Sequence, residues 1–286
     1  VALGFADPTA TLSVANVFAQ DTVRLASDLH LTLGVKVEHN SYTGADVLPN
    51  VRLAWQVADE HVLWSAVSRA VRTPSRIDRE LQGGGFLVPA ESFRNETLTA
   101  FEVGYRGQPT SDTTLSVSAF YNVYDDLRTI GVTPTGQLSF MNDLEGETYG
   151  VEAWGTWDVM PAWRLRAGGN WLHKELRVAS GAVDLSDLQA AGQDPTYQAQ
   201  LRSELDLGGG VSFDVALRQV GRVSPSQVPS YTELDAHLLW QVTPVLSVSL
   251  HGWNLLQSER PEVIDPSTSP PRTLGRSVYG RLRVEF

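Results

Sequence analysis

Strict alternation of apolar and polar residues is the feature of this sequence that most constrains its fold. In residues 29–38 one face carries Leu29, Leu31, Leu33, Val35 and Val37, and the other carries His30, Thr32, Lys36 and Glu38. Residues 197–207 and 231–242 repeat the pattern. A period of two indicates strands with two different faces. We count about 13 such segments, each near the roughly 9–11 residues with which a tilted strand crosses a bilayer. The sequence therefore predicts an all-β chain.

The links between these segments alternate in length. Short links are expected at residues 26–28, 58–60, 108–112, 160–162, 208–210 and 243–244. Longer links are expected at residues 40–49, 71–95, 131–137, 179–194, 222–230 and 257–272. Short turns on one side and long loops on the other are typical of barrels in the outer membrane, whereas a soluble sandwich has no reason to sort its links in this way.

Composition excludes several other classes of protein. The 286 residues include no cysteine, which removes disulfide scaffolds and thiolate chemistry. The net charge of −11 argues against a nucleic-acid partner. The sequence contains no nucleophile and base pattern of an enzyme, and its six histidines lack metal-ligand spacing, so we expect no enzymatic activity, no metal site and no cofactor.

Alternation alone does not distinguish a lipid-facing sheet from a soluble one, but aromatic and charged residues favour the membrane. Trp55, Trp157, Trp163 and Trp240 lie near predicted short turns, as in the aromatic girdle of a barrel. The polar faces carry full charges, such as Arg164 with Arg166 and Arg281 with Arg283. Such rows suit a hydrated lumen that contains compensating carboxylates.

The last predicted strand, residues 276–286, ends the chain on an aromatic residue. Phe286, Val284 and Leu282 share one of its faces. A terminal alternating strand that closes on phenylalanine resembles the signal read by the bacterial machinery that assembles outer-membrane barrels. An ordinary edge strand would expose this apolar row to aggregation unless it were covered.

Several segments together resemble one family. They are NVFAQDTVRL (16–25), LTLGVKVEHN (31–40), PNVRLAW (49–55), LWSAVSRAVRTPSR (63–76), NETLTAFEVGYRG (95–107), FYNVYDDLRT (120–129), YGVEAWG (149–155), HGWNLL (251–256) and the Phe286 ending. In this order they resemble the C-terminal part of the β-barrel of a TonB-dependent outer-membrane receptor.

The resemblance implies an antiparallel up-and-down transmembrane β-barrel of 22 strands, of which this chain would supply about 13. Residues 1–286 would be one C-terminal portion of the barrel domain, with the N-terminal plug and the early strands missing. The odd strand count fits a portion of a barrel, because single-chain bacterial barrels have even numbers.

The resemblance also implies a function and partners. We expect active uptake of a scarce metal chelate, most often an iron–siderophore, across the outer membrane of a Gram-negative type of bacterium. The partners would be membrane lipid and lipopolysaccharide, the barrel assembly machinery, and the TonB complex through the missing N-terminal part. A passive porin-like channel and a soluble or surface β-sheet binding protein remain as alternatives.

Three arginines, Arg69, Arg72 and Arg76, enter the longest predicted link. In the resembled family this region rises from the barrel rim toward the ligand vestibule, so we expect these arginines to attract an anionic metal chelate. Pairing with charges of the lumen or of lipopolysaccharide is the alternative role. The identity of the ligand is left open among siderophore, cobalamin, haem and carbohydrate.

Overall fold

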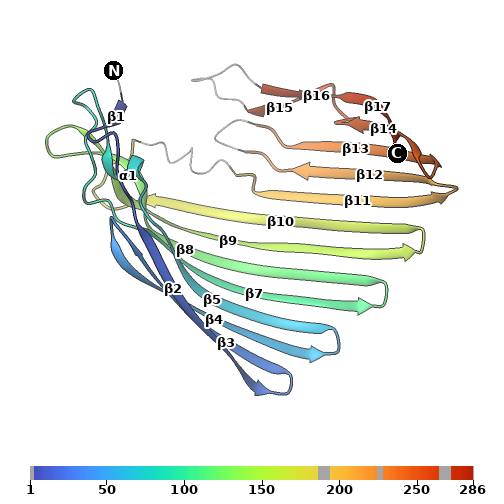
Figure 1. The fold of residues 1–286 in the computed structure, drawn as a ribbon, viewed down its shortest axis with the longest axis horizontal. Helices are drawn as coiled ribbons and strands as arrows, with labels where there is room; N and C mark the ends of the chain where they lie inside the picture. The colour runs from blue at the N-terminus through green and yellow to red at the C-terminus, as the bar shows by residue number, and fades with distance from the viewer. Residues whose placement is uncertain (1–2, 186–193, 224–227, 264–271, 286) are drawn as a thin grey trace. The chain divides into compact units, whose positions relative to one another are not determined.

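The computed structural model describes residues 3–185, 194–223, 228–263 and 272–285, and their regular secondary structure is almost entirely strand (Figure 1). The main sheet consists of β2 (Val14–Ala26), β3 (Leu29–Asn40), β4 (Gly44–Ala58), β5 (His61–Arg72), β7 (Glu96–Thr110), β8 (Thr113–Val132), β9 (Leu138–Met160), β10 (Trp163–Val178), β11 (Tyr197–Gly208), β12 (Val211–Val220), β13 (Tyr231–Thr243), β14 (Leu246–Trp253) and β17 (Ser277–Val284). The links contain β1 (Leu3–Phe5), α1 (Arg76–Glu80), β6 (Leu81–Gly83), β15 (Glu259–Val263) and β16 (Arg272–Gly275). None of the described residues belongs to a helix of the length and apolar character needed to cross a membrane.

The 13 strands of the main sheet follow one another in chain order. The sheet runs from β17 through β14, β13, β12, β11, β10, β9, β8, β7, β5, β4 and β3 to β2. Its strand pairs, such as β2 with β3, β3 with β4 and β13 with β14, are antiparallel, as the up-and-down topology requires. The expected strand number and topology are therefore confirmed. Within the described residues β2 and β17 are the two edges of this sheet.

All six predicted short links are present as tight turns between consecutive strands. The strands themselves are often longer than expected. β8 has 20 residues and β9 has 23, about twice the length that a tilted strand needs to cross a bilayer. The crossing sets only a minimum length, and antiparallel pairing continues for as long as both partners stay extended.

The long link expected at residues 40–49 was wrong. β3 ends at Asn40 and β4 begins at Gly44, and Pro49 lies inside β4 opposite Val35. The side-chain oxygen of Asn40 accepts hydrogen bonds from the backbone N–H of Tyr42 at 2.9 Å and of Thr43 at 3.0 Å. Gly44 takes a φ of 79°, which favours glycine. This turn chemistry closes the link in three residues.

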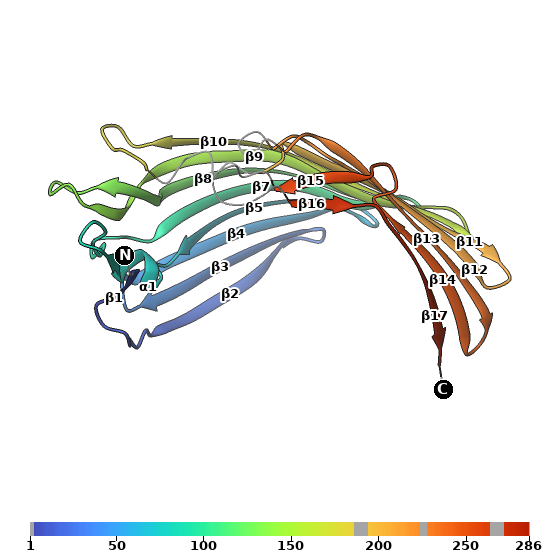
Figure 2. The ribbon, with the colours of Figure 1, turned by 90° about the horizontal axis from the view of Figure 1, so that it is seen from above.

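The chain forms two compact units. The first contains residues 1–104, 119–149 and 173–191, and the second contains residues 105–118, 150–172 and 192–286. Strands β7 to β10 contribute a segment to each. In the first unit, β1 and α1 gather at the end of β3, β4 and β5 where the long β5–β7 link lies (Figures 1 and 2).

One face of the strands is apolar and is not covered by protein in the described residues. Val17, Val47 and Leu282 keep 67%, 57% and 67% of their surface exposed. The buried apolar residues are few, namely Ala66, Ala90, Phe93, Leu144, Val220 and Val228. A soluble domain hides its apolar face in a core, and patches this large otherwise mark a surface that meets lipid or protein. The sheet therefore needs an apolar medium on this face.

Tryptophans at the short turns fit the same arrangement. Trp55 and Trp157 are about half exposed, and each indole N–H donates to an aspartate of a neighbouring turn. The distances are 2.9 Å from Trp55 to Asp28 and 3.3 Å from Trp157 to Asp112. An apolar ring with its polar edge turned toward a hydrated turn is typical of residues at a membrane interface.

An arginine on the apolar face should destabilise the protein far more than one on the polar face. Val51 lies in the middle of β4 on the exposed apolar face, whereas Gln56 lies on the opposite face of the same strand. We expect Val51→Arg to lower the free energy of unfolding in lipid vesicles by about 2–4 kcal/mol. Gln56→Arg should cost well under half of that. Equal costs in denaturant titrations would contradict a lipid-facing apolar surface.

Candidate functional site

A pocket of about 570 Å³ lies in the first unit, and five neighbouring strands line it. Its charged residues are Arg72 of β5, Glu96 of β7, Arg128 of β8 and Lys174 of β10. The other lining residues are aromatic, apolar or neutral, namely Tyr124, Leu127, Leu144, Thr148 and Leu176. The volume suits a small ligand, and the three cationic groups favour an anion.

A buried carboxylate holds two of these cations. The side chain of Asp78 has no exposed surface, and it accepts hydrogen bonds from Nη1 of Arg72 and Nη1 of Arg128, each at 3.0 Å. The two arginine side chains remain 46% and 47% exposed. The carboxylate therefore lies behind two guanidinium groups that still face the pocket. A buried charge requires such partners, because an unpaired one would be strongly destabilising.

Local sequence explains how Asp78 reaches this position. Ser75 is the N-cap of α1, and Asp78 occupies the third helical position of a capping box. The Asp78 carboxylate accepts hydrogen bonds from the backbone N–H and the hydroxyl of Ser75, both at 2.8 Å. Pro74 precedes this cap and disfavours a helical conformation at Thr73. The capping box at the start of α1 thus places the Asp78 carboxylate next to the end of β5.

The environment of Asp78 keeps its carboxyl group ionised. Burial by itself would raise the pKa of Asp78. The hydrogen bonds from the Ser75 backbone, the Arg128 side chain, the Ser75 hydroxyl and the Arg72 side chain together outweigh burial and lower that pKa to about 2. The two arginines consequently face a full negative charge throughout the neutral pH range.

Glu96 ties the same arginines together from the pocket side. Its carboxylate accepts a hydrogen bond from Nε of Arg72. The other oxygen of Glu96 accepts from the backbone N–H of Arg128 at 2.7 Å. The guanidinium of Arg128 also lies 5.3 Å from the ring centre of Phe140. Each arginine side chain is half exposed and has little packing around it. Ion pairs, hydrogen bonds and the ring contact are therefore what hold the two side chains in place.

Further contacts anchor α1 and the β5–β7 link. Tyr42, in the β3–β4 turn, donates a hydrogen bond to Glu80. Nη1 of Arg79 donates to the carbonyl of the buried Phe93 at 2.6 Å. Leu138, at the start of β9, donates its N–H to the carbonyl of Phe86 at 2.7 Å. The link is thus attached to neighbours on both sides.

The structure separates the three arginines that the sequence singled out. Only Arg72 lines the pocket. Arg69 is three residues earlier in β5, so its side chain leaves the opposite face of the strand, together with that of the exposed Val67. Arg76 pairs with Glu80 at 2.7 Å, and its guanidinium lies 4.3 Å from the ring centre of Phe5.

Sequence reasoning missed Asp78, Arg128 and Lys174. Arg128 is 50 residues from Asp78 along the chain and contacts it only through the folded sheet. Lys174 belongs to a fifth strand of the pocket. The capping pattern of Ser75 and Asp78 was a readable signal for a short helix, but no local pattern indicates which strands a link folds over.

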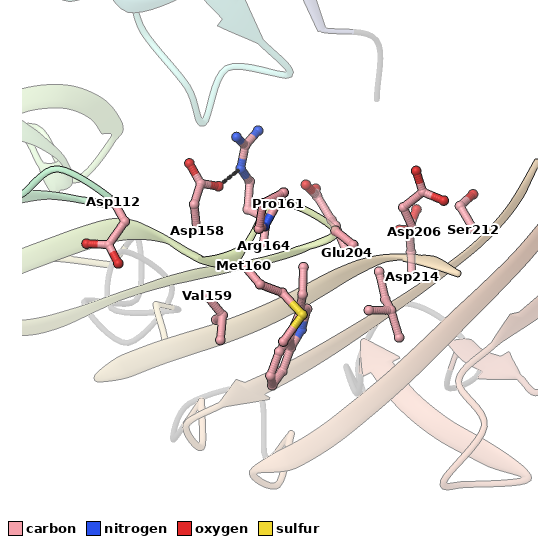
Figure 3. Close-up of a pocket in the computed structure, with 13 residues that line it drawn as sticks. Asp112, Asp158, Val159, Met160, Pro161, Arg164, Glu204, Asp206, Ser212 and Asp214 are labelled. Atoms are coloured by element: carbon pink, nitrogen blue, oxygen red, sulfur yellow. Dashed lines mark hydrogen bonds and ion pairs between the residues drawn. The ribbon is translucent and has the colours of Figure 1, made fainter. Parts of the chain in front are cut away.

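A larger pocket of about 700 Å³ lies in the second unit beside the β9–β10 turn (Figure 3). Its carboxylates are Asp112, Asp158, Glu204, Asp206 and Asp214, and its cationic lining residue is Arg164, which pairs with Asp158. Nearby, Arg166 pairs with Glu204 at 3.3 Å, so the expected compensation of arginines by carboxylates is confirmed here. A lining this acidic repels anions. Although this pocket is larger, it is therefore not our candidate site for an anionic ligand.

The residues of the predicted assembly signal lie at the last edge of the sheet. Leu282 pairs with Val248, and Val284 pairs with Leu246, on the exposed apolar face. Phe286 lies outside the described residues. Among the residues that the structure describes, no group of three or more histidine, aspartate or glutamate side chains is arranged to hold a metal ion.

Comparison with known sequences identifies one family. The family described as TonB dependent receptor-like, beta-barrel matches residues 2–255. An iron-regulated outer membrane virulence protein of Vibrio cholerae is 23% identical in an alignment of 266 positions that covers 85% of this chain and 40% of that protein. A pesticin receptor of Yersinia enterocolitica is 28% identical in an alignment of 238 positions that covers 75% of this chain and 34% of that protein. The chain thus spans well under half the length of these relatives.

Solved structures agree on the fold. The siderophore receptor PirA of Acinetobacter baumannii superposes with a TM-score of 0.77 at 16% identity, over 96% of this chain and 46% of that one. The ferric yersiniabactin uptake receptor FyuA of Yersinia pestis gives a TM-score of 0.72 at 20% identity over the same shares. At these identities the likeness establishes the barrel fold and leaves the ligand to other evidence.

The low pKa of Asp78 predicts how the β5–β7 link responds to acid. The ordinary aspartate pKa is about 3.9, so a native value of about 2 stabilises the link above pH ~4, and this contribution is lost as the pH falls toward 2. We expect amide-exchange protection of residues 73–95, corrected for intrinsic rates, to decline in that window.

Asp78→Asn provides the matched comparison. In this variant, the amides of residues 73–95 should already be less protected from exchange at pH 7. Their protection should also decline less than in the natural protein as the pH falls from about 4 toward 2. Identical acid profiles for the variant and the natural protein would show that Asp78 does not stabilise the link.

Proposed function

Since the chain belongs to the TonB-dependent receptor-like β-barrel family, we propose that it is the C-terminal part of the barrel of a receptor that imports a ferric chelate, in the first place a ferric siderophore. The family places the protein in the outer membrane. The exposed apolar face of the strands is in accord with that location.

The barrel of the complete receptor has 22 strands in this proposal, and the 13 seen here are its final ones. Support comes from the two sheet edges, β2 and β17, which need strand partners in lipid because no water is present to satisfy their backbone groups. An N-terminal plug would gate the lumen, and the TonB complex would act on that plug. Barrel assembly would use the terminal strand with Leu282, Val284 and Phe286.

The observation that carries the ligand proposal is the pair of half-exposed arginines in the 570 Å³ pocket. Arg72 and Arg128 present guanidinium N–H groups beside Lys174, and such groups bind anionic oxygen ligands through charge-assisted hydrogen bonds. Aromatic and apolar residues of the same pocket would contact the organic part of a chelate. Among the sequence relatives, an iron-regulated outer membrane virulence protein is in accord with an iron chelate as the ligand.

The other two arginines take different roles in this proposal. Arg69, on the face shared with Val67, is placed to meet phosphate groups of lipopolysaccharide near the outer end of β5. Arg76 attaches the N-terminal segment to α1, because it also donates to the carbonyl of Pro8 at 3.3 Å. The capture site therefore retains Arg72 from the original three and gains Arg128 and Lys174.

Alanine substitutions in the complete receptor test the capture site. We expect Arg72→Ala and Arg128→Ala each to weaken binding of a triply negative iron(III) tris-catecholate about ten-fold, the loss of one good charge-assisted hydrogen bond. Arg69→Ala, on the other face of β5, should leave the dissociation constant unchanged. Fluorescence quenching in detergent gives these constants. Equal binding by all three variants and the natural receptor would rule out this pocket.

Energy dependence distinguishes active import from a passive channel. Cells that carry the complete receptor should accumulate ⁵⁵Fe from the chelate and should stop when an uncoupler collapses the proton gradient. Surface binding of the chelate should persist under the uncoupler. Accumulation that continues at the same rate would instead support a porin-like channel.

A further inference from the structure

We propose that Asp78 is a positioning residue of the capture pocket and that it makes the pocket selective for negatively charged chelates. The inference rests on the proposed function and adds to it a residue that the ligand does not touch. The juxtaposition behind it is a fully buried carboxylate bound to two half-exposed guanidinium groups from different strands.

Without a partner, Arg72 and Arg128 would be poorly ordered. Arginine side chains have several rotatable bonds, and fixing one that is half exposed costs conformational entropy. Their Nη1 atoms both bind Asp78, one to each carboxylate oxygen. Each guanidinium group is thereby bonded to Asp78 on one side and is exposed to the pocket on the other. A ligand that meets them does not have to order them first, which improves affinity.

The Asp78 carboxylate is itself fixed by its neighbours. Asp78 is held by the N–H and the hydroxyl of Ser75, so the oxygens that orient the arginines are themselves oriented. Helix α1 in turn is attached to the β3–β4 turn through Tyr42 and Glu80. Through Asp78, the β5–β7 link therefore fixes the orientation of the two arginines on β5 and β8. A positioning residue must be held in this way.

Positioning of the arginines and simple charge balance are two distinguishable roles of Asp78. Asp78 adds one negative charge to a cationic pocket, so its removal makes the pocket more positive. If charge balance were its whole role, Asp78→Asn would tighten the binding of an anion. If Asp78 positions the arginines, the same variant weakens that binding. The two roles predict opposite signs.

The test compares Asp78→Asn with the control variant Glu91→Gln in the complete receptor. Both remove one carboxylate from the β5–β7 link, but Glu91 is exposed to solvent and lies outside α1. The probes are a triply negative iron(III) tris-catecholate and an uncharged iron(III) tris-hydroxamate. We expect Asp78→Asn to raise the dissociation constant of the anionic probe about ten-fold, as expected when one well-placed charge-assisted hydrogen bond is lost. Glu91→Gln should not raise it.

The uncharged probe tests the selectivity part of the proposal. The natural receptor should bind it much more weakly than the anionic probe, and Asp78→Asn should narrow the difference between the two. Unchanged or tighter binding of the anionic probe by Asp78→Asn would overturn the positioning role. Equal affinity of the natural receptor for both probes would overturn the selectivity.

A double-mutant cycle excludes an indirect loss of structure. If Asp78 acts through the arginines, its substitution should have little further effect on binding in an Arg72→Ala, Arg128→Ala background. A full ten-fold loss in that background would show that Asp78 acts in another way. Heat-modifiable gel mobility of each variant confirms that the barrel is folded. If the arginine variants alone leave binding unchanged, the capture pocket itself is refuted, which is an outcome distinct from failure of the Asp78 proposal.

Discussion

The structure depends on one constraint, which is that each long strand has an apolar face that no part of the described chain covers. Residues such as Val17, Val47 and Leu282 remain mostly exposed, and the few buried apolar side chains cannot form a core for a sheet of 13 strands. Lipid on the apolar face provides the medium that a core would provide in a soluble protein. The polar face is then left for water and charged side chains, and it is where we propose that ligand binds.

This arrangement determines how a binding site can be built. A hydrated face offers little packing, so ion pairs and hydrogen bonds hold its charged side chains in place. The β5–β7 link meets that need by returning a buried carboxylate, Asp78, to the strands that carry Arg72 and Arg128. Elsewhere on the sheet, pairs such as Arg166 with Glu204 are more exposed and contribute less to stability. Burial of the carboxylate is what distinguishes the pocket cluster from these surface pairs.

Much of the fold was predictable because its signal is local. A period of two is visible within about ten residues, and turn residues such as those at 208–210 mark where a strand ends. The link expected at 40–49 failed because Asn40 and Gly44 close a tight turn from a short polar run. The site was harder to predict. Arg69 and Arg72 are near in sequence but lie on opposite faces, whereas Arg72 and Arg128 meet only after strands pair and the link folds back. Strand pairing over such distances leaves no mark in either segment alone.

The most direct test of this account is a crystal structure of the complete receptor with bound iron(III) tris-catecholate, in which anomalous scattering at the iron absorption edge locates the metal. The account predicts one iron peak on the polar face of the sheet, with chelate oxygens within hydrogen-bond distance of Arg72 and Arg128 and with Asp78 still bound to both. An iron peak elsewhere in the lumen, with these arginines still paired only to Asp78 and Glu96, would contradict the assignment of the capture pocket.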